Sequence, residues 1–352
     1  MSVEGEEDKD LTGMNVMKLE TYRDAQRACE MLVSDPKVEY AHLIQERFLS
    51  PSAKRKVTRG NNQTLDPLIS RQWGLVAVNL FQALKMPGFN TAKDIVVAII
   101  DTGVDANHPD LDGIVTDEQN FTSGPLQDTK GHGTHVIGII AAMRNNKIGI
   151  SGVCQSQKIM SLKALGPYNG PGYYRAIRYA INNGAQVINL SLGGGHDQTE
   201  ELLIRKAIKQ GVIVVAAMGN EFKEGNPTSY PAAIDGVISV GASTEVDERA
   251  SFSNTGPHIN LMAPGTSILS TVPTYPVELA DVLNYEAWPG TSMATPFVAA
   301  TAALLLAKKP TATLKQVTQA LVKGSDKVPG QTGFSKEFGH GRLNVKRALA
   351  GI

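Results

Sequence analysis

From residue 66 onward, short runs of consecutive apolar residues alternate with longer stretches in which apolar residues recur at helical spacing. The runs are IVVAII (95–100), IMSLKAL (159–165), QVINLSL (186–192), VIVVAA (212–217) and GVISVGA (236–242). Apolar runs without polar alternation are typical of parallel strands buried on both faces. Helical stretches lie between them, at 131–144, 172–182 and 199–209. This order predicts an α/β fold, with a mostly parallel sheet covered by helices and the functional site at the carboxyl ends of the strands.

The first 48 residues follow a different pattern, in which one amphipathic helix precedes an extended segment. Pro36 ends the helix, which is indicated by five apolar residues at helical spacing: Leu19, Tyr22, Ala25, Ala28 and Leu32. Residues 49–65 are polar, basic and contain glycine, as an exposed linker does. The pattern therefore predicts a small N-terminal α+β unit (1–48), a linker (49–65) and a main domain (66–352).

Composition narrows the class of protein without identifying it. The chain has 352 residues, 42% of them hydrophobic, and its 34 basic and 34 acidic residues give a formal net charge of zero. This balance removes the usual electrostatic reason to expect a nucleic-acid or membrane-surface partner. The N-terminus MSVEGEEDKD is acidic where a secretory signal is basic and then apolar, so we expect a cytoplasmic protein as written, and a secreted one if the true N-terminus is missing.

The tripeptide Asp101-Thr102-Gly103 directly follows an apolar run and has two possible meanings. In an aspartic protease, two such carboxylates share one proton. In other enzymes a single acid orients a histidine. The sequence contains no second DTG or DSG, and the α/β pattern disagrees with an all-β aspartic protease. Asp101 is therefore expected to act with a histidine.

Three further residues stand at positions suited to acyl-transfer chemistry. His132 lies between glycines at the start of a predicted helix, and Ser292 follows Gly290-Thr291 at the start of another. Backbone N–H groups at a helix N-terminus favour developing negative charge. Asn220 follows the end of a predicted strand, where its amide can donate to an oxyanion. Because Ala294 replaces the second glycine of Gly-x-Ser-x-Gly, an α/β-hydrolase elbow is disfavoured.

In this order, the segments resemble the subtilisin family of serine proteases. AIIDTGVDANHPDL (98–111), GHGTHVIGIIAA (131–142) and GTSMATPFVAA (290–300) are similar to its aspartate, histidine and serine motifs. INLSLGG (188–194) and AAMGNE (216–221) resemble its substrate-strand and oxyanion segments, and FGHGRLNVKRAL (338–349) resembles its usual ending. The resemblance covers roughly residues 66–352. It implies a hydrolase with the subtilisin-like three-layer fold.

The resemblance also implies the role of each residue. Ser292 is the nucleophile, His132 the general base and acid, and Asp101 the group that orients the imidazole. Asn220 and the Ser292 backbone N–H stabilise the oxyanion. The substrate cleft is implied to comprise Gly170, Pro171, Ser191, Leu192, Gly193, Gly194, Ala217, Gly219 and Ser229. These small residues, with no acidic one among them, predict a serine endopeptidase of broad specificity that prefers an apolar residue before the cleaved bond.

The loop AAMRNNKIGISG (141–152) resembles a calcium-binding loop of thermitase-like members of the family. The implied ligands of a structural Ca²⁺ ion are the side chains of Asp66, Asp110 and Asn146 and the backbone carbonyls of Met143, Ile148 and Ile150. Hard oxygen donors in this number suit calcium better than magnesium. The alternative is that Asp110 caps a turn and the loop is ordered without metal. No cofactor is expected to take part in the chemistry.

The N-terminal unit resembles the end of a subtilisin propeptide, although it is shorter than usual. The expected partners are therefore protein or peptide substrates and the chain's own N-terminal segment, which acts as an inhibitor until the 49–65 linker of the zymogen is cleaved. A different class of function stays open. The protein could be a non-catalytic or permanently self-inhibited interaction protein with the same fold.

Overall fold

The computed structural model describes residues 6–7, 15–17, 22–33, 37–44, 47, 49, 66–87, 89, 94–155, 157–166 and 171–352. Within these residues, seven strands form one parallel sheet in the order β4-β5-β3-β6-β7-β8-β9. They are β3 (Val96–Asp101), β4 (Val115–Asn120), β5 (Lys158–Lys163), β6 (Val187–Leu190), β7 (Ile213–Ala217), β8 (Ile238–Ser243) and β9 (Leu261–Pro264). The predicted apolar runs thus coincide with the buried strands.

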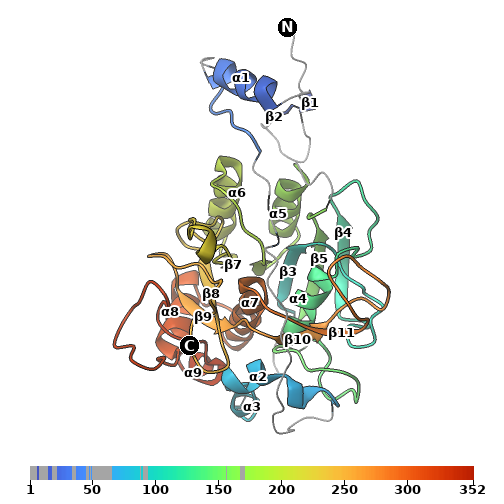
Figure 1. Cartoon of the computed structure of the whole chain (residues 1–352), viewed down its shortest axis with the longest axis vertical. Helices are drawn as coiled ribbons and strands as arrows, with labels where there is room; N and C mark the ends of the chain where they lie inside the picture. The colour runs from blue at the N-terminus through green and yellow to red at the C-terminus, as the bar shows by residue number, and fades with distance from the viewer. Residues whose placement is uncertain are drawn as a thin grey trace.

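Helices cover both faces of this sheet, so the domain has three layers (Figure 1). One face carries α4 (His132–Ala141) and α7 (Thr291–Lys308), and the other carries α5 (Gly172–Asn182) and α6 (Gln198–Lys209). Alternate side chains of β3 enter different apolar clusters: Val97 and Ile99 pack on the α7 side, and Ala98 and Ile100 on the α5 side. The fold prediction is confirmed.

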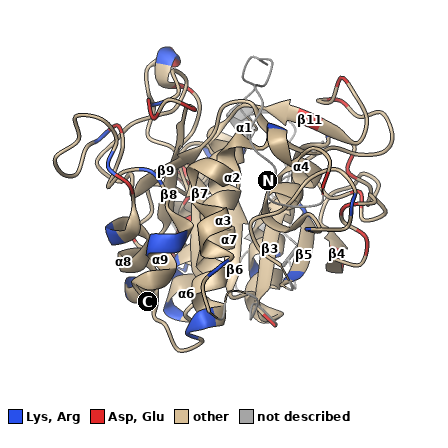
Figure 2. Cartoon of the chain, turned by 90° about the horizontal axis from the view of Figure 1, so that it is seen from below, with Lys and Arg blue, Asp and Glu red and all other residues tan. Residues whose placement is uncertain are grey.

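Shorter elements complete the α7 side and the rims. They are η1 (Ile69–Arg71), α2 (Trp73–Ala77), α3 (Leu80–Ala83), η2 (Phe222–Glu224), α8 (Leu314–Gly324), α9 (Val345–Ala350) and the antiparallel pair β10 (Ile268–Thr271) and β11 (Tyr285–Trp288). Most charged residues lie on the outer helices and loops in Figure 2, whereas most of the central helix α7 is tan. α7 is long and apolar enough to cross a membrane, but 89% of it is buried inside the protein, as befits a core helix.

The N-terminal segment contains the short pair β1 (Glu6–Glu7) and β2 (Asn15–Val16) and the helix α1 (Tyr22–Val33). They stand at one end of the molecule, beyond α5 and α6 (Figure 1). The described residues between 37 and 49 form neither helix nor strand, and they lead toward α6. The predicted N-terminal helix is present, and the domain boundaries at 48 and 65 stay a prediction because residues 50–65 lie outside the described part.

Candidate active site

Asp101 and His132 meet where β3 ends and α4 begins. The Nδ1 atom of His132 lies 2.7 Å from Oδ1 of Asp101, and both side chains are buried. The same carboxylate oxygen accepts the Thr102 backbone N–H at 2.8 Å. A carboxylate at Nδ1 keeps the proton of a neutral imidazole on that nitrogen, which leaves Nε2 as an acceptor.

Two glycines allow this close meeting. Gly131 has a φ of 90° at the N-cap of α4, in the left-handed region that favours glycine. A Cβ atom on Gly133 would overlap the carbonyl oxygen of Gly103, directly after the end of β3. The Gly-His-Gly sequence therefore lets α4 start against the β3 terminus. The helix was predicted over 131–144 but ends at Ala141, because Ala142 is extended and Met143 N–H donates to the Asp110 carbonyl at 2.9 Å.

Ser292 is the second residue of α7 and is tied to the end of β6 by two reciprocal hydrogen bonds. Its hydroxyl donates to the Ser191 carbonyl at 3.1 Å, and the Ser191 hydroxyl donates to the Ser292 carbonyl at 2.8 Å. Pro296 is the sixth residue of α7, past the first turn. Its missing N–H would have bonded the Ser292 carbonyl. The Ser191 hydroxyl supplies the replacement donor.

Among the described residues, no hydrogen bond joins the Ser292 hydroxyl to His132. The hydroxyl faces the Ser191 carbonyl instead. Catalytic hydrogen bonds are often long or poorly aligned without a bound substrate, so this arrangement does not remove Ser292 as the partner of His132.

Two donors converge beside Gly290. The Asn220 side-chain oxygen accepts the N–H and the hydroxyl of Thr291, both at 2.8 Å, which fixes the amide with Nδ2 directed away from Thr291. A Cβ atom on Gly290 would lie 3.6 Å from both Asn220 Nδ2 and the Ser292 backbone N. Gly290 has φ 150° and ψ 153°, a region that only glycine adopts readily. The space beside Gly290, next to the Met293 sulfur at 3.2 Å, is thus within reach of both donors.

The predicted cleft residues Ser191, Leu192, Gly193 and Gly194 follow the end of β6 in one segment, which we call the substrate edge. Gly194 forms two backbone hydrogen bonds with Tyr230, each 3.0 Å long. Because backbone groups of successive extended residues face opposite sides, those of Gly193 face away from Tyr230. Pro171 lies at the start of α5. Gly170, the predicted cleft residue before Pro171, lies outside the described residues.

A carboxylate that was not predicted lies beside Gly219, one of the predicted cleft residues. Gly193 lies against the Ser229 hydroxyl, as expected, and Ala217 is buried. A Cβ atom on Gly219, however, would lie 2.6 Å from the Glu221 carboxylate, although no acidic group was expected here. Glu221 accepts the Asn220 N–H at 2.8 Å and the Asn254 amide at 3.1 Å. The position of Glu221 directly after the predicted oxyanion residue Asn220 is the sequence feature that could have indicated this carboxylate.

The six predicted metal-binding residues surround the loop after α4. Asp66 accepts the N–H of Asn145 at 2.9 Å, and Asp110 accepts the Asn146 amide at 2.7 Å and the Ile150 N–H at 2.8 Å. Both carboxylates are buried, and burial raises the pKa of Asp110. The described residues contain no group of three or more His, Cys, Asp or Glu side chains suited to a metal. The predicted set has only two carboxylates, so its other ligands would be an amide and backbone carbonyls.

The chain is similar in sequence and fold to known proteases. The sequence model of the Subtilase family matches residues 92–341. Subtilisin of Bacillus pumilus is 41% identical over 76% of this chain and 94% of its own, and subtilisin E of Bacillus subtilis is 37% identical over 92% of this chain and 78% of its own. A solved protease structure from Pseudoalteromonas arctica has a TM-score of 0.73 at 27% identity, covering 82% of this chain and 99% of its own.

The family match covers more than half of the chain, and the alignment with the Bacillus pumilus subtilisin covers most of that protease. It includes the ends of β3, β6 and β7 and the start of α4 and α7, where the candidate side chains gather. The chain therefore belongs to the subtilase family and is a serine endopeptidase.

Proposed function

We propose that this protease hydrolyses peptide bonds through an acyl-enzyme formed on Ser292, with His132 as general base and acid and Asp101 as the group that orients the imidazole. The observation that carries this proposal is the buried 2.7 Å contact between Asp101 and His132 Nδ1, at the same sheet edge as Ser292. It leaves Nε2 able to take a proton.

The steps follow from these positions. His132 Nε2 takes the Ser292 proton while Oγ attacks the peptide carbonyl, and it then returns the proton to the departing amine. Water deacylates the enzyme through the same histidine. The oxyanion of each tetrahedral intermediate lies beside Gly290, where Asn220 Nδ2 and the Ser292 N–H donate to it. None of these steps requires a metal.

The preferred substrate is an extended peptide with an apolar residue before the cleaved bond. Such a peptide pairs with the backbone of Gly193, whose hydrogen-bonding groups face away from Tyr230. Small residues leave room for an apolar side chain between Gly193 and Ala217. The Glu221 carboxylate does not contradict this preference, because it is engaged with the Asn220 N–H and the Asn254 amide.

The N-terminal segment is proposed to inhibit the enzyme until the linker is cut. Its support is the docking of His42 and Arg47 at the start of α6. His42 Nε2 lies 2.8 Å from the Thr199 hydroxyl, and buried Arg47 donates to the Glu200 carboxylate and the Gly195 carbonyl. Gly195 directly follows the substrate edge, so a segment docked here leads toward the cleft.

Calcium is proposed as a structural ion at the loop after α4. The support is that Asp66 and Asp110, distant in sequence, are buried against the same loop and supply hard oxygen atoms. Asn146 and the carbonyls of Met143, Ile148 and Ile150 complete the proposed set. Asn146 presents Nδ2 to Asp110, so its amide must turn to act as an oxygen ligand. Bound calcium would tether the start of the domain to this loop.

Turnover of denatured casein by the wild-type chain and by Ser292→Ala tests the catalytic proposal. We expect Ser292→Ala to lose both proteolysis and covalent labelling by a fluorophosphonate. Equal labelling of the two proteins would exclude Ser292 as the nucleophile. A wild-type chain that neither cleaves nor is labelled would favour the permanently self-inhibited alternative.

A further inference from the structure

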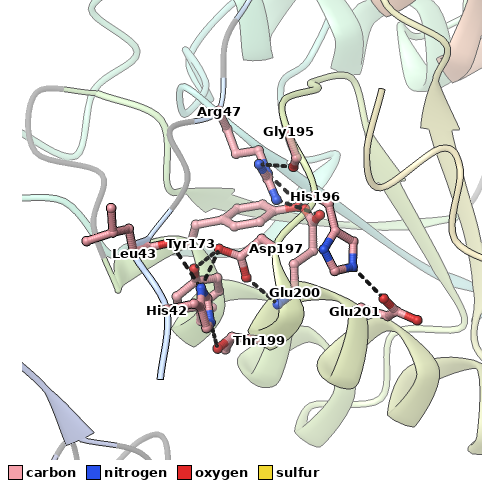
Figure 3. Close-up of polar contacts among 11 residues, drawn as sticks. His42, Leu43, Arg47, Tyr173, Gly195, His196, Asp197, Thr199, Glu200 and Glu201 are labelled. Atoms are coloured by element: carbon pink, nitrogen blue, oxygen red, sulfur yellow. Dashed lines mark hydrogen bonds and ion pairs between the residues drawn. The ribbon is translucent and has the colours of Figure 1, made fainter. Parts of the chain in front are cut away.

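The N-terminal segment places one arginine in a complete guanidinium-binding arrangement on the catalytic domain (Figure 3). Arg47 Nε donates to Glu200 Oε1 at 2.9 Å, and Nη2 donates to Oε2 at 2.6 Å. Nη1 donates to the Gly195 carbonyl at 3.0 Å. All three guanidinium nitrogens are therefore bonded, two of them to one carboxylate. This planar, bidentate geometry suits arginine and cannot be matched by lysine.

The receptor groups are held by the catalytic domain itself. The Tyr173 hydroxyl on α5 donates to Glu200 Oε1 at 2.7 Å, and the Tyr173 ring lies 5.7 Å from Arg47 Cζ. Asp197 caps α6 by accepting the Glu200 N–H at 2.8 Å. These contacts orient the Glu200 carboxylate independently of Arg47. Only the guanidinium comes from the N-terminal segment.

The pair is buried, which makes its loss costly. The side chains of Arg47 and Glu200 are 2% and 0% exposed. Burial opposes the charge of Arg47, but the Glu200 carboxylate, together with Tyr173 and Asp197, outweighs burial and keeps the pKa of Arg47 above its ordinary value. Removing one member of a buried pair leaves the other charge without compensation. A second guanidinium is therefore the natural replacement when Arg47 departs.

The position relative to the cleft gives this site a role in substrate selection. Ser191 contacts the proposed nucleophile Ser292, and Gly195 lies four positions further along the same edge. Four residues of extended chain span at most about 14 Å. A substrate lying extended along this edge therefore presents to Glu200 a side chain about four residues before the cleaved bond.

We propose that Glu200, with Tyr173 and the Gly195 carbonyl, forms a subsite that selects substrates carrying arginine three to five residues before the cleaved bond. Arg47 occupies this subsite in the intact chain. The inference depends on the proposed function, because it adds a specificity determinant to the same cleft. It also explains why a carboxylate is buried at the start of α6, where the triad does not need it.

The test uses the full chain with Arg47→Ala, which vacates the subsite. A peptide series keeps one apolar residue before the cleaved bond and moves a single arginine from two to six residues before it. Matched peptides carry citrulline, which keeps the shape and loses the charge, or lysine. We expect kcat/KM to be about tenfold higher or more for arginine than for citrulline at one position between three and five. Arg47→Ala/Glu200→Gln should abolish the preference, and Arg47→Ala/Glu201→Gln, which changes the half-buried neighbouring carboxylate, should retain it.

Fluorescence anisotropy with Arg47→Ala/Ser292→Ala measures binding of the same labelled peptides without catalysis. Tighter binding of the arginine peptide by about tenfold supports the subsite, even if turnover fails. Equal binding and equal turnover of the arginine and citrulline peptides at every position would overturn it, whether or not the Glu200 variant folds. Failure of the proposed function looks different, because the Arg47→Ala chain would then cleave neither casein nor any peptide and would not react with a fluorophosphonate.

Discussion

The buried carboxylate of Asp128 accepts the hydroxyl hydrogen of Thr102 at 2.8 Å, and this bond joins the two motifs that supply Asp101 and His132. The same carboxylate accepts the Gly131 N–H at 2.8 Å and the N–H and hydroxyl of Thr134 at 3.0 and 2.7 Å. Asp128 therefore caps the first turn of α4 while it holds the end of β3. It is a positioning residue for the Asp101–His132 pair.

Asp128→Asn should lower kcat by about tenfold to a hundredfold with little change in KM. The carboxylate accepts these hydrogen bonds with two oxygen atoms, whereas asparagine has only one acceptor oxygen. The resulting shift matters because a displacement of about 1 Å at a catalytic group lowers the rate on the order of a hundredfold. Loss of the cap should also destabilise the protein by about 1 kcal/mol. Steady-state kinetics and thermal unfolding check this. Thr102→Ser, which keeps the hydroxyl, is the matched control, and a stability loss with unchanged kcat would make Asp128 structural only.

Asn220→Ala should lower kcat by roughly 10²–10³ with little change in KM, the magnitude measured for an oxyanion asparagine in subtilisin. The reason is that Nδ2 donates to charge that develops only in the transition state. Because the Asn220 oxygen also accepts two bonds from Thr291, thermal unfolding must be compared in parallel. A defect confined to KM would make Asn220 a substrate-binding residue instead.

Gly290→Ala should impair catalysis by filling the oxyanion space. The added methyl would lie 3.6 Å from both Asn220 Nδ2 and the Ser292 N and 3.2 Å from the Met293 sulfur, and it would also strain a backbone with φ 150°. We expect at least a tenfold fall in kcat, of the order of losing one oxyanion donor. Gly330→Ala, at an exposed left-handed position with no neighbour near its Cβ, controls for the backbone strain. Similar kinetics for the Gly290 and Gly330 variants would refute the steric argument.

Much of this site could be predicted from the sequence because its parts are local. The Gly-His-Gly and Gly-Thr-Ser segments carry their own backbone requirements, and the buried strands have no polar alternation. The Arg47–Glu200 pair joins residues 153 positions apart, and no local pattern indicates that contact. Likewise, the donor that replaces the missing N–H of Pro296 is the hydroxyl of Ser191, which is distant in sequence. Tertiary contacts of this kind decide specificity and positioning, and they were not predicted.

His135 should make the protein less stable in acid. It is buried and stacked on Trp288 at a centroid distance of 4.6 Å, and burial lowers its pKa from 6.5 to about 3. Between these values the unfolded chain binds a proton that the native state does not, so stability falls as the pH drops below about 6.5 and stops falling near 3. At about 1.4 kcal/mol per unit, the total is of the order of 5 kcal/mol.

Chemical denaturation of wild type and His135→Gln at pH 7, 5 and 4 measures this dependence. We expect glutamine to reduce the loss of stability between pH 7 and 4, even though it lowers stability at pH 7 by removing the stacked ring. His340→Gln is a suitable comparison, because His340 is also a histidine with a lowered pKa but is less buried. Parallel pH profiles for wild type and His135→Gln would contradict the assignment.

Calcium removal distinguishes two ways of ordering the loop after α4. Asn145 and Lys147 have φ of 65° and 66°, and their N–H groups donate to the Asp66 carboxylate at 2.9 and 3.3 Å. These bonds order the loop without metal. If calcium binds as proposed, free ion at one hundred times Kd adds about 2.7 kcal/mol to stability. Excess EDTA should then lower the unfolding temperature and accelerate autolysis of the wild-type chain. Asp110→Ala should unfold at the same temperature with calcium and with EDTA, since it lacks a proposed ligand. Identical unfolding of metal-free wild type with and without added calcium would mean that the N–H donors of the loop, and no cation, satisfy Asp66 and Asp110.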